Sequence, residues 1–349
     1  MAPTKTAIAF QGGGALGAYA FGALKRIYED EPGLKPTCVS GVSIGAFTAA
    51  IVASHPEDPV SGLQAFWDDL TVMQSAFLPP SAEKFLAYFG NAAFYWPRLD
   101  YFRLPFWTNF YELGPIKSTL SRHVDLERLA KVEIKLVVTA TDVLSGEIVE
   151  FSNADPKHPI PMDPLIASGS LPPSYPAREI GGKLYWDGGL FDNTPLSSLL
   201  KQIDANDAPA TRVIVINLFP NEGAIPKNML EVFDRMTELQ FANKTGKDVE
   251  LARTINKLIA IVEKLQGRGA AEPGSVLLQP DFADLAKYKV FENIISISNR
   301  EPEPVSSSAD FSRKSIDRRI AAGYRDAGIA LAHPPKAAAA LKAEISKPI

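Results

Sequence analysis

Two glycine-rich turns near the N-terminus restrict the fold more than any other feature of this sequence. The first, residues 12–17 (GGGALG), follows a short apolar run at residues 7–10 and begins a stretch with apolar residues at helical spacing. The second, residues 41–45 (GVSIG), separates the apolar run at residues 37–40 from an almost wholly apolar stretch at residues 44–53. Strand, helix, strand and helix in about 45 residues predict parallel strands covered by helices.

The rest of the chain divides into segments of different character. Residues 56–115 are rich in aromatic side chains, with 15 of the chain's 33 between Phe66 and Tyr111, and prolines interrupt them. We predict an insertion outside the sheet that forms part of an apolar pocket, a lid or a local subcore. Strands are then predicted at residues 132–140, 147–151, 183–186 and 212–219, and helices at 229–239, 251–265 and 312–331.

The expected fold class is α/β, a three-layer α/β/α arrangement with a mainly parallel central sheet. We predict a catalytic domain at residues 6–205. Residues 206–335 would complete the sheet and form a helical C-terminal extension, and residues 336–349 a loose tail. For the helix at 312–331, whose arginines could contact anionic lipid, docking on the parent domain is favoured over lying on a membrane.

The first glycine turn suits either of two kinds of negatively charged group. Backbone N–H groups at a strand-to-helix turn can hold a pyrophosphate or the oxyanion of an acyl-transfer intermediate, and the spacing of glycines 12, 14 and 17 fits G-x-G-x-x-G. A dinucleotide site also requires an acidic residue at the end of the second strand. Here the acidic residues 29–31 precede that strand. The sequence therefore favours an oxyanion hole, with a plain tight turn as the remaining alternative.

Ser43 is the centre of a G-x-S-x-G motif. Between a strand and a helix, this motif forms a strained turn that exposes the serine, and a Cβ on either flanking glycine would collide with the other arm of the turn. Gly41 and Gly45 occupy these flanking positions. We therefore predict that Ser43 is a nucleophile, the alternative being a turn that needs small residues for packing.

A serine nucleophile requires a base, and the histidines offer no convincing one. All four resemble surface or loop histidines: His55, His123, His158 and His333. Asp187 ends a predicted strand, and Gly188 and Gly189 leave the approach to its carboxylate open. An Asp-Gly hairpin turn would have the same sequence. If a carboxylate is the base, activity should persist below pH ~6.

Together, the motifs at residues 12–17, 41–45 and 187–189 resemble the signature of the patatin-like phospholipases. Residues 167–172 (ASGSLP) are similar to the stretch that precedes the aspartate in this family, and the resemblance covers residues 6–205. It implies a serine hydrolase that cleaves carboxylic esters of lipids, phospholipids among them, through a Ser-Asp dyad and an acyl-enzyme intermediate, and releases fatty acid.

The resemblance also implies a role for each motif residue. Ser43 would be the nucleophile, Asp187 its base, and the N–H groups of Gly12, Gly13 and Gly14 the oxyanion hole. The residues that support the motifs would be Gly17, Gly41, Gly45, Gly188 and Gly189. Leu16 stands where many members carry Lys or Arg, which leaves the preference for phospholipid over other esters open.

Charge and composition limit the partners. A net charge of −4 provides no positive potential for binding the phosphates of nucleic acid. No cofactor or metal is expected, because the acidic residues lack calcium or zinc spacing. The single cysteine, Cys38, lies in an apolar run and should be a buried thiol. Without a long apolar stretch, we expect a cytoplasmic protein, in peripheral contact with membranes at most. Two other functions stay open: a dinucleotide- or phosphate-binding enzyme, and a non-catalytic lipid-binding scaffold.

Overall fold

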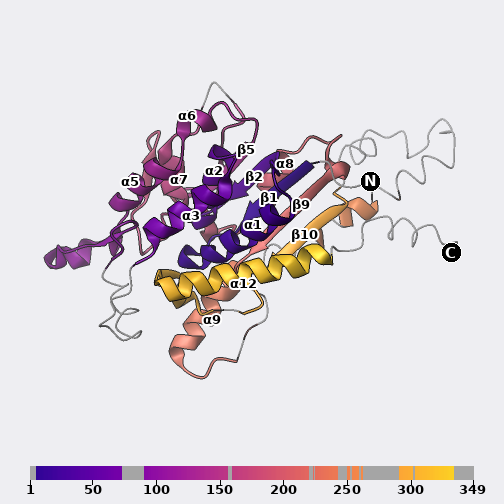
Figure 1. Ribbon diagram of the computed structural model, residues 1–349. Coiled ribbons are helices and arrows are strands. Elements are labelled where there is room, and N and C mark those ends of the chain that lie inside the picture. The colour runs from indigo at the N-terminus through magenta and orange to yellow at the C-terminus, as the bar shows by residue number, and fades with distance from the viewer. Residues whose placement is uncertain are drawn as a thin grey trace, which may run out of the picture.

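The computed structural model describes residues 5–72, 90–155, 159–219, 223, 225–242, 250–251, 254–258, 261, 291–301 and 303–333. A central sheet of eight strands organises this part of the chain (Figure 1). Its strands are β1 (Lys5–Phe10), β2 (Cys38–Gly41), β5 (Lys135–Asp142), β6 (Ile148–Ser152), β7 (Arg178–Ile180), β8 (Lys183–Asp187), β9 (Thr211–Asn217) and β10 (Asn293–Ser298). Their order is β10-β9-β1-β2-β5-β8-β7, and β6 pairs with β5.

The sheet is mainly parallel, as predicted. β10, β9, β1, β2 and β5 run in one direction, whereas β6, β7 and β8 are antiparallel to their neighbours at one side. No strand was predicted beyond residue 219, where helices were expected to dominate, yet β10 pairs with β9. The pattern of β10 (NIISIS) is that of a short strand at the edge of the sheet, where exposed serines weaken the apolar signal.

Helices cover both faces of the sheet, and alternate residues of β1 separate the two cores. Ile8 and Phe10 pack with α1 (Ala18–Asp30) and α2 (Ile44–Ser54), whereas Ala7 and Ala9 pack with α8 (Leu196–Lys201). Every residue of α2 is buried, which explains its unbroken apolar sequence. The helices are α1 (Ala18–Asp30), α2 (Ile44–Ser54), α3 (Pro59–Leu70), α5 (Gly114–His123), α6 (Leu126–Leu129), α7 (Met162–Ser168), α8 (Leu196–Lys201), α9 (Met229–Ala242) and α12 (Arg313–Ala332) in the part of the chain that the structure describes.

The C-terminal helix α12 docks on α1, which confirms the favoured prediction (Figure 1). Glycines make the approach close: a Cβ on Gly323 would lie 1.9 Å from the carbonyl oxygen of Tyr19, and one on Gly22 equally close to that of Ile320. A larger residue at either position would push the two helices apart. No helix in the described ranges is both long enough and apolar enough to cross a bilayer.

The aromatic insertion lies outside the central sheet where the structure describes it, as predicted. It contains α3, a separate two-stranded sheet of β3 (Trp96–Pro97) and β4 (Tyr111–Glu112), and the exposed 3-10 segment η2 (Tyr101–Phe106). Residues 73–89 of the insertion, most of the helix predicted at 251–265 and the tail at 336–349 lie outside the described residues. The proposed domain limits stay a prediction.

Candidate active site

Ser43 and Asp187 are brought together by two strands that lie end to end. Along one side of β5, Val138 pairs with Gly41 of β2 and Ala140 pairs with Asp187 of β8, while β6 occupies the other side. β8 is antiparallel to β5, so its carboxyl end faces the carboxyl end of β2. The sequence predicted Asp187 at the carboxyl end of a strand. In the structure this strand end meets the carboxyl end of β2 because β8 is antiparallel to β5.

Ser43 occupies a strained turn between β2 and α2. Its φ of 56° and ψ of −129° make it the one non-glycine residue with positive φ in the described part of the chain. A Cβ on Gly41 would lie 2.1 Å from the carbonyl oxygen of Gly45, and one on Gly45 would lie 2.5 Å from that of Phe10. The Ser43 N–H donates to Oγ of Ser168 at 2.9 Å. Both glycines are therefore required for this geometry.

Asp187 is a buried carboxylate with few partners. Its residue is 2% exposed, and Oδ1 accepts a hydrogen bond from the Gly189 N–H at 2.7 Å. Burial raises the pKa of Asp187 to about 7, because a charged carboxylate is poorly solvated there; hydrogen bonds from the Gly189 N–H and the Ser43 side chain oppose this rise. A carboxylate with a pKa near neutrality is a far stronger base than an ordinary aspartate.

This pKa changes the pH dependence expected from the sequence. An ordinary carboxylate would keep its activity below pH ~6, as an aspartate ionises near pH ~4. With Asp187 ionising near pH 7, a base in this position loses its function as the pH falls through about 7. The acidic limb of the pH–rate profile therefore lies where that of a histidine base would lie, so this profile does not distinguish an aspartate base from a histidine base.

The glycine turn approaches Ser43 closely, but its three glycines differ in their hydrogen bonds. The Gly12 N–H donates to the carbonyl oxygen of Asn193 at 3.1 Å, which removes Gly12 from the donors expected for an oxyanion hole. Position 12 requires glycine for another reason, because a Cβ there would lie 2.6 Å from Asn193 Oδ1 and 3.1 Å from Ser43 Cβ. Gly13 and Gly14 line the same cavity as Ser43 and Asp187, and their N–H groups have no acceptor among the described residues.

Asn193 is a site residue that the sequence analysis missed. Its side-chain Nδ2 donates to the carbonyl oxygen of Gly12 at 3.1 Å, and a Cβ on Gly189 would lie 2.7 Å from its Oδ1. Asn193 thus joins the glycine turn to the turn that follows Asp187. Its segment resembles a helix start in sequence, but α8 begins only at Leu196. The signal that could have revealed it is the polar pair Asp-Asn placed just after Asp-Gly-Gly.

Ser43 and Asp187 share a cavity of about 410 Å³ with the glycine turn. Its apolar wall is built from aromatic side chains of separate segments, and the insertion contributes three of them. These aromatic residues are Phe94, Tyr95, Tyr111, Tyr175, Phe219 and Phe241. The predicted contribution of the insertion to an apolar pocket therefore agrees with the structure. A larger hollow of about 1290 Å³ beside Trp96 and Arg122 contains none of the motif residues.

The remaining sequence candidates lie away from the cavity. His123 pairs with Asp69 at 2.8 Å, and neither it nor His55 or His333 lines the cavity; His158 lies outside the described residues. Leu16 is buried in the core. Cys38 is buried as predicted, and burial raises the pKa of its thiol to about 12. In the described ranges, no three His, Cys, Asp or Glu side chains gather in a way that could hold a metal ion.

Comparison with known proteins identifies the family. The family model described as "Patatin-like phospholipase" matches residues 8–200, more than half of the chain, and a second model described as "Patatin phospholipase" matches residues 239–342. The chain belongs to the patatin-like phospholipase family. This family membership makes the protein a lipid ester hydrolase. The second match also places the C-terminal region within a patatin phospholipase, which the sequence motifs alone did not establish.

Solved structures provide more distant likenesses to this patatin-like protein. VipD from Legionella pneumophila shares 15% identity over 95% of this chain and 67% of its own, with a TM-score of 0.41. The complex of ExoU with SpcU from Pseudomonas aeruginosa shares 18% identity over 71% of this chain and 52% of the matched chain, with a TM-score of 0.31. Both scores are too low to add evidence about the site. No curated protein matches the chain.

Proposed function

We propose that the protein hydrolyses lipid esters with a Ser43–Asp187 dyad. The supporting observation is the head-on meeting of β2 and β8, which leaves Ser43 on its strained turn beside a buried carboxylate and places no described histidine in the cavity. Family membership supports the reaction class, and the geometry supports the residues that carry it.

In the proposed first step, Asp187 removes the proton of the Ser43 hydroxyl as Oγ attacks the ester carbonyl carbon. The tetrahedral intermediate collapses, the bond to the alcohol breaks, and the proton passes from Asp187 to the departing alkoxide. A water molecule then loses a proton to Asp187 and attacks the acyl-serine. Asp187 returns this proton to Ser43, and the free fatty acid leaves.

The negative oxygen of each tetrahedral intermediate requires hydrogen-bond donors. We assign this role to the N–H groups of Gly13 and Gly14, which have no acceptor among the described residues and belong to residues that line the cavity, and not to Gly12. A donor of this kind lowers the barrier by about 3 kcal/mol. The six aromatic side chains around the cavity suit the acyl chain of the substrate.

The two alternative functions find less support. A dinucleotide site would use all of the outward N–H groups of the glycine turn for a pyrophosphate, yet the Gly12 N–H is occupied by Asn193. A non-catalytic lipid-binding scaffold would have no need of a strained serine facing a buried carboxylate.

A fluorophosphonate probe tests the proposed nucleophile directly. We expect wild-type protein to be labelled at a single site, and peptide mapping to identify it as Ser43, because only a serine with an activated oxygen attacks the phosphorus. Ser43→Ala should not be labelled, while Ser145→Ala, an exposed turn serine, should react like the wild type. Labelling that survives in Ser43→Ala would exclude Ser43 as the nucleophile.

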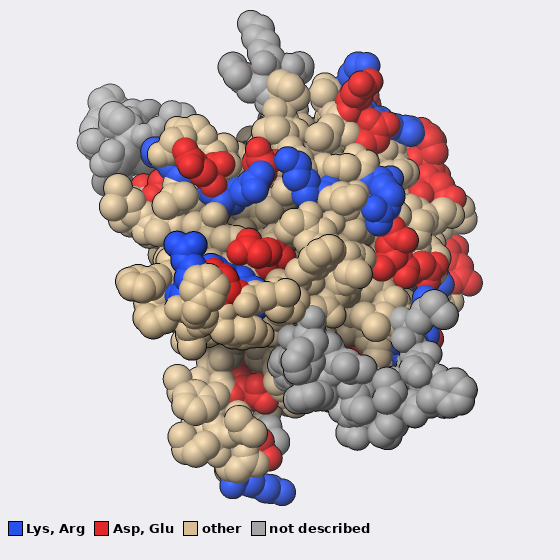
Figure 2. Space-filling model, turned by 90° about the vertical axis from the view of Figure 1, so that its left-hand side faces the viewer, with Lys and Arg blue, Asp and Glu red and all other residues tan. Residues whose placement is uncertain are grey.

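We also propose that the exposed part of the aromatic insertion, residues 99–106, contacts lipid; we call it the prong. Phe102 and Phe106 are 85% and 82% exposed. Figure 2 shows the side from which η2 projects in Figure 1, where groups of charged residues lie among residues of other kinds. Shortly after the prong, the N–H groups of Phe110 and Tyr111 donate to the carbonyl oxygen of Ser174, and Tyr111 and Ser174 line the cavity. Exposed aromatic groups beside such a cavity are suited to a lipid interface.

The double substitution Phe102→Ser and Phe106→Ser tests the prong. We expect binding to phosphatidylcholine vesicles to fall at least about tenfold, because each phenyl ring buried in lipid contributes about 2 kcal/mol, and the loss of even half of this from both rings lowers affinity more than tenfold. Hydrolysis of a short, water-soluble ester should not change. Leu144→Ser, which alters another exposed apolar residue, serves as the control. Unchanged vesicle binding in the double variant, or an equal loss in the control, would contradict the proposal.

A further inference from the structure

The glycine turn is covered by a segment that precedes the C-terminal helix. Residues 303–310, which we call the strap, contain the 3-10 segment η6 (Val305–Ala309), and four strap residues line the catalytic cavity. Gly14 has a φ of 56°, and a Cβ there would lie 2.5 Å from the carbonyl oxygen of Ser308. The backbone of the strap therefore lies directly against the proposed oxyanion-hole turn.

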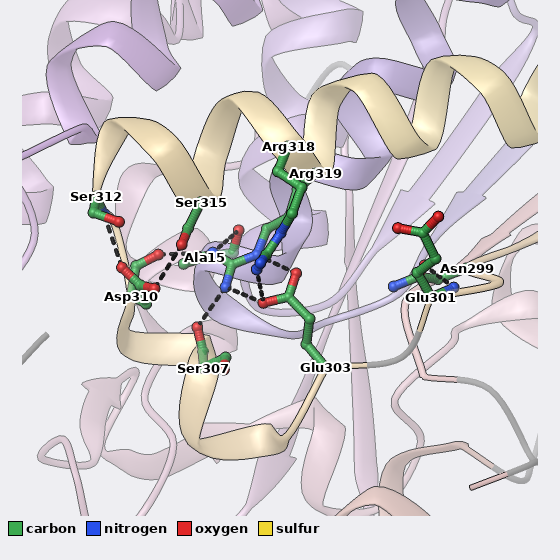
Figure 3. Close-up of polar contacts among 10 residues, drawn as sticks. All are labelled: Ala15, Asn299, Glu301, Glu303, Ser307, Asp310, Ser312, Ser315, Arg318 and Arg319. Carbon is green, nitrogen blue, oxygen red and sulfur yellow. Dashed lines mark hydrogen bonds and ion pairs between the residues drawn. The ribbon is translucent and has the colours of Figure 1, made fainter. Parts of the chain in front are cut away.

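Arg319 of α12 joins the strap to this turn. The residue is 2% exposed, and its five N–H groups all donate hydrogen bonds within the protein (Figure 3). The acceptors are the carboxylate of Glu303 (3.0 and 2.8 Å) and the carbonyl oxygens of Ala15 (3.3 Å), Ser307 (3.0 Å) and Asp310 (2.7 Å).

These bonds act on the backbone rather than on a substrate. Ala15 directly follows Gly14, so the guanidinium fixes the turn one residue away from a proposed oxyanion donor. Glu303 balances the charge of Arg319, and Arg319 does not line the cavity. The glycine turn itself has no charged residue, and Leu16 is buried in the core. The guanidinium that holds the turn comes from a helix about 300 residues further along the chain.

We propose that Arg319 is a positioning residue that fixes the Gly13 and Gly14 N–H groups for the oxyanion, so that the C-terminal helix completes the active site. This inference rests on the proposed hydrolase mechanism. Small displacements of an oxyanion donor reduce stabilisation of the transition state more than they reduce substrate binding. The reason is that the ester oxygen carries its negative charge only in the transition state and the tetrahedral intermediate.

Arg319→Met is the direct test, with Arg318→Met as the local control. Arg318 pairs with the same Glu303 carboxylate at 2.7 Å but is half exposed and has no bond to the glycine turn. With a short-chain ester, we expect Arg319→Met to lower kcat by about 10- to 100-fold while KM stays within about threefold. Arg318→Met should keep both constants within about threefold. The rate of fluorophosphonate labelling at Ser43 should fall in parallel with kcat.

A second control separates positioning from loss of stability. Arg212 of β9 is also buried, pairs with Glu31 at 2.8 Å and donates to the Thr6 hydroxyl, but it does not line the cavity. Arg212→Met should lower the urea midpoint to an extent comparable with Arg319→Met, yet leave kcat within about threefold. Equal losses of kcat in these two variants would reduce Arg319 to a structural role and overturn the inference.

Arg319→Lys keeps the test decisive if Arg319→Met does not fold. Lysine retains the charge but lacks the planar fork and two of the five donors, so kcat should still fall about tenfold. Full activity of Arg319→Lys would overturn the inference. If wild-type protein neither hydrolyses the ester nor labels at Ser43, the proposed function fails; if wild type is active and the Arg319 variants match it, this inference alone fails.

Discussion

Replacing Asp187 by Asn is expected to abolish ester hydrolysis as completely as replacing Ser43 by Ala, with kcat at least about 10,000-fold below that of the wild type. In a dyad the aspartate takes the proton of the serine, and an amide cannot accept it. The buried site contains no described histidine that could act instead. The measurement is kcat on a short-chain ester, with circular dichroism to confirm that both variants are folded.

Histidine substitutions are the necessary control for this prediction. His55→Gln, His123→Gln, His158→Gln and His333→Gln should each leave kcat within a few fold. These variants are more informative than a pH profile, because Asp187 has a pKa of about 7 and its acidic limb coincides with that of an imidazole. A thousandfold loss in one histidine variant with an intact fold would show that a triad operates and that Asp187 only orients its base.

The same Asp187→Asn substitution is expected to stabilise the protein at alkaline pH. The pKa of Asp187 is raised from an ordinary value of 3.8 to about 7 by burial. The folded state therefore binds a proton more tightly than the unfolded state, and stability is lost as the pH rises from about 4 to about 7. Asn does not titrate. The free energy of unfolding at pH 8 should thus rise by about 4 kcal/mol relative to the wild type.

The pH dependence of this gain distinguishes its cause. The difference in unfolding free energy between Asp187→Asn and the wild type should fall to less than about 2 kcal/mol at pH 5, because Asp187 is then mostly protonated in the folded wild-type protein. Urea unfolding of both proteins at pH 5 and pH 8 measures this difference in unfolding free energy. Ser43→Ala should not show the same change with pH, since Asp187 is still present. A gain for Asp187→Asn that is equal at pH 5 and pH 8 would mean that improved packing, and not removal of a buried charge, is responsible.

A substitution that removes activity but stabilises the fold, as expected for Asp187→Asn, is typical of a functional site. A carboxylate that is 2% exposed and accepts few hydrogen bonds lowers the stability of the fold in its charged form. Residues retained at such a cost are commonly those that function requires. The strained φ of Ser43 belongs to the same category.

Local patterns in the sequence were sufficient for the parts of the site that depend on short-range geometry. The turn at Ser43 could be predicted because Gly41 and Gly45 must be glycines wherever a strand and a helix enclose a serine this tightly. The burial of α2 followed from its unbroken apolar residues, and the docking of α12 from its apolar stripe. Asp187 was found as a motif residue at the end of a strand.

Only the tertiary structure decided how these parts meet. No local pattern shows that β8 is antiparallel and faces the end of β2, because strand direction depends on pairing partners distant in sequence. The hydrogen bond of the Gly12 N–H to Asn193 and the bond from Arg319 to Ala15 each join residues more than 140 positions apart. The raised pKa of Asp187 comes from burial within the folded protein. Hydrogen bonding and desolvation are set by which groups become neighbours, and the fold determines that choice.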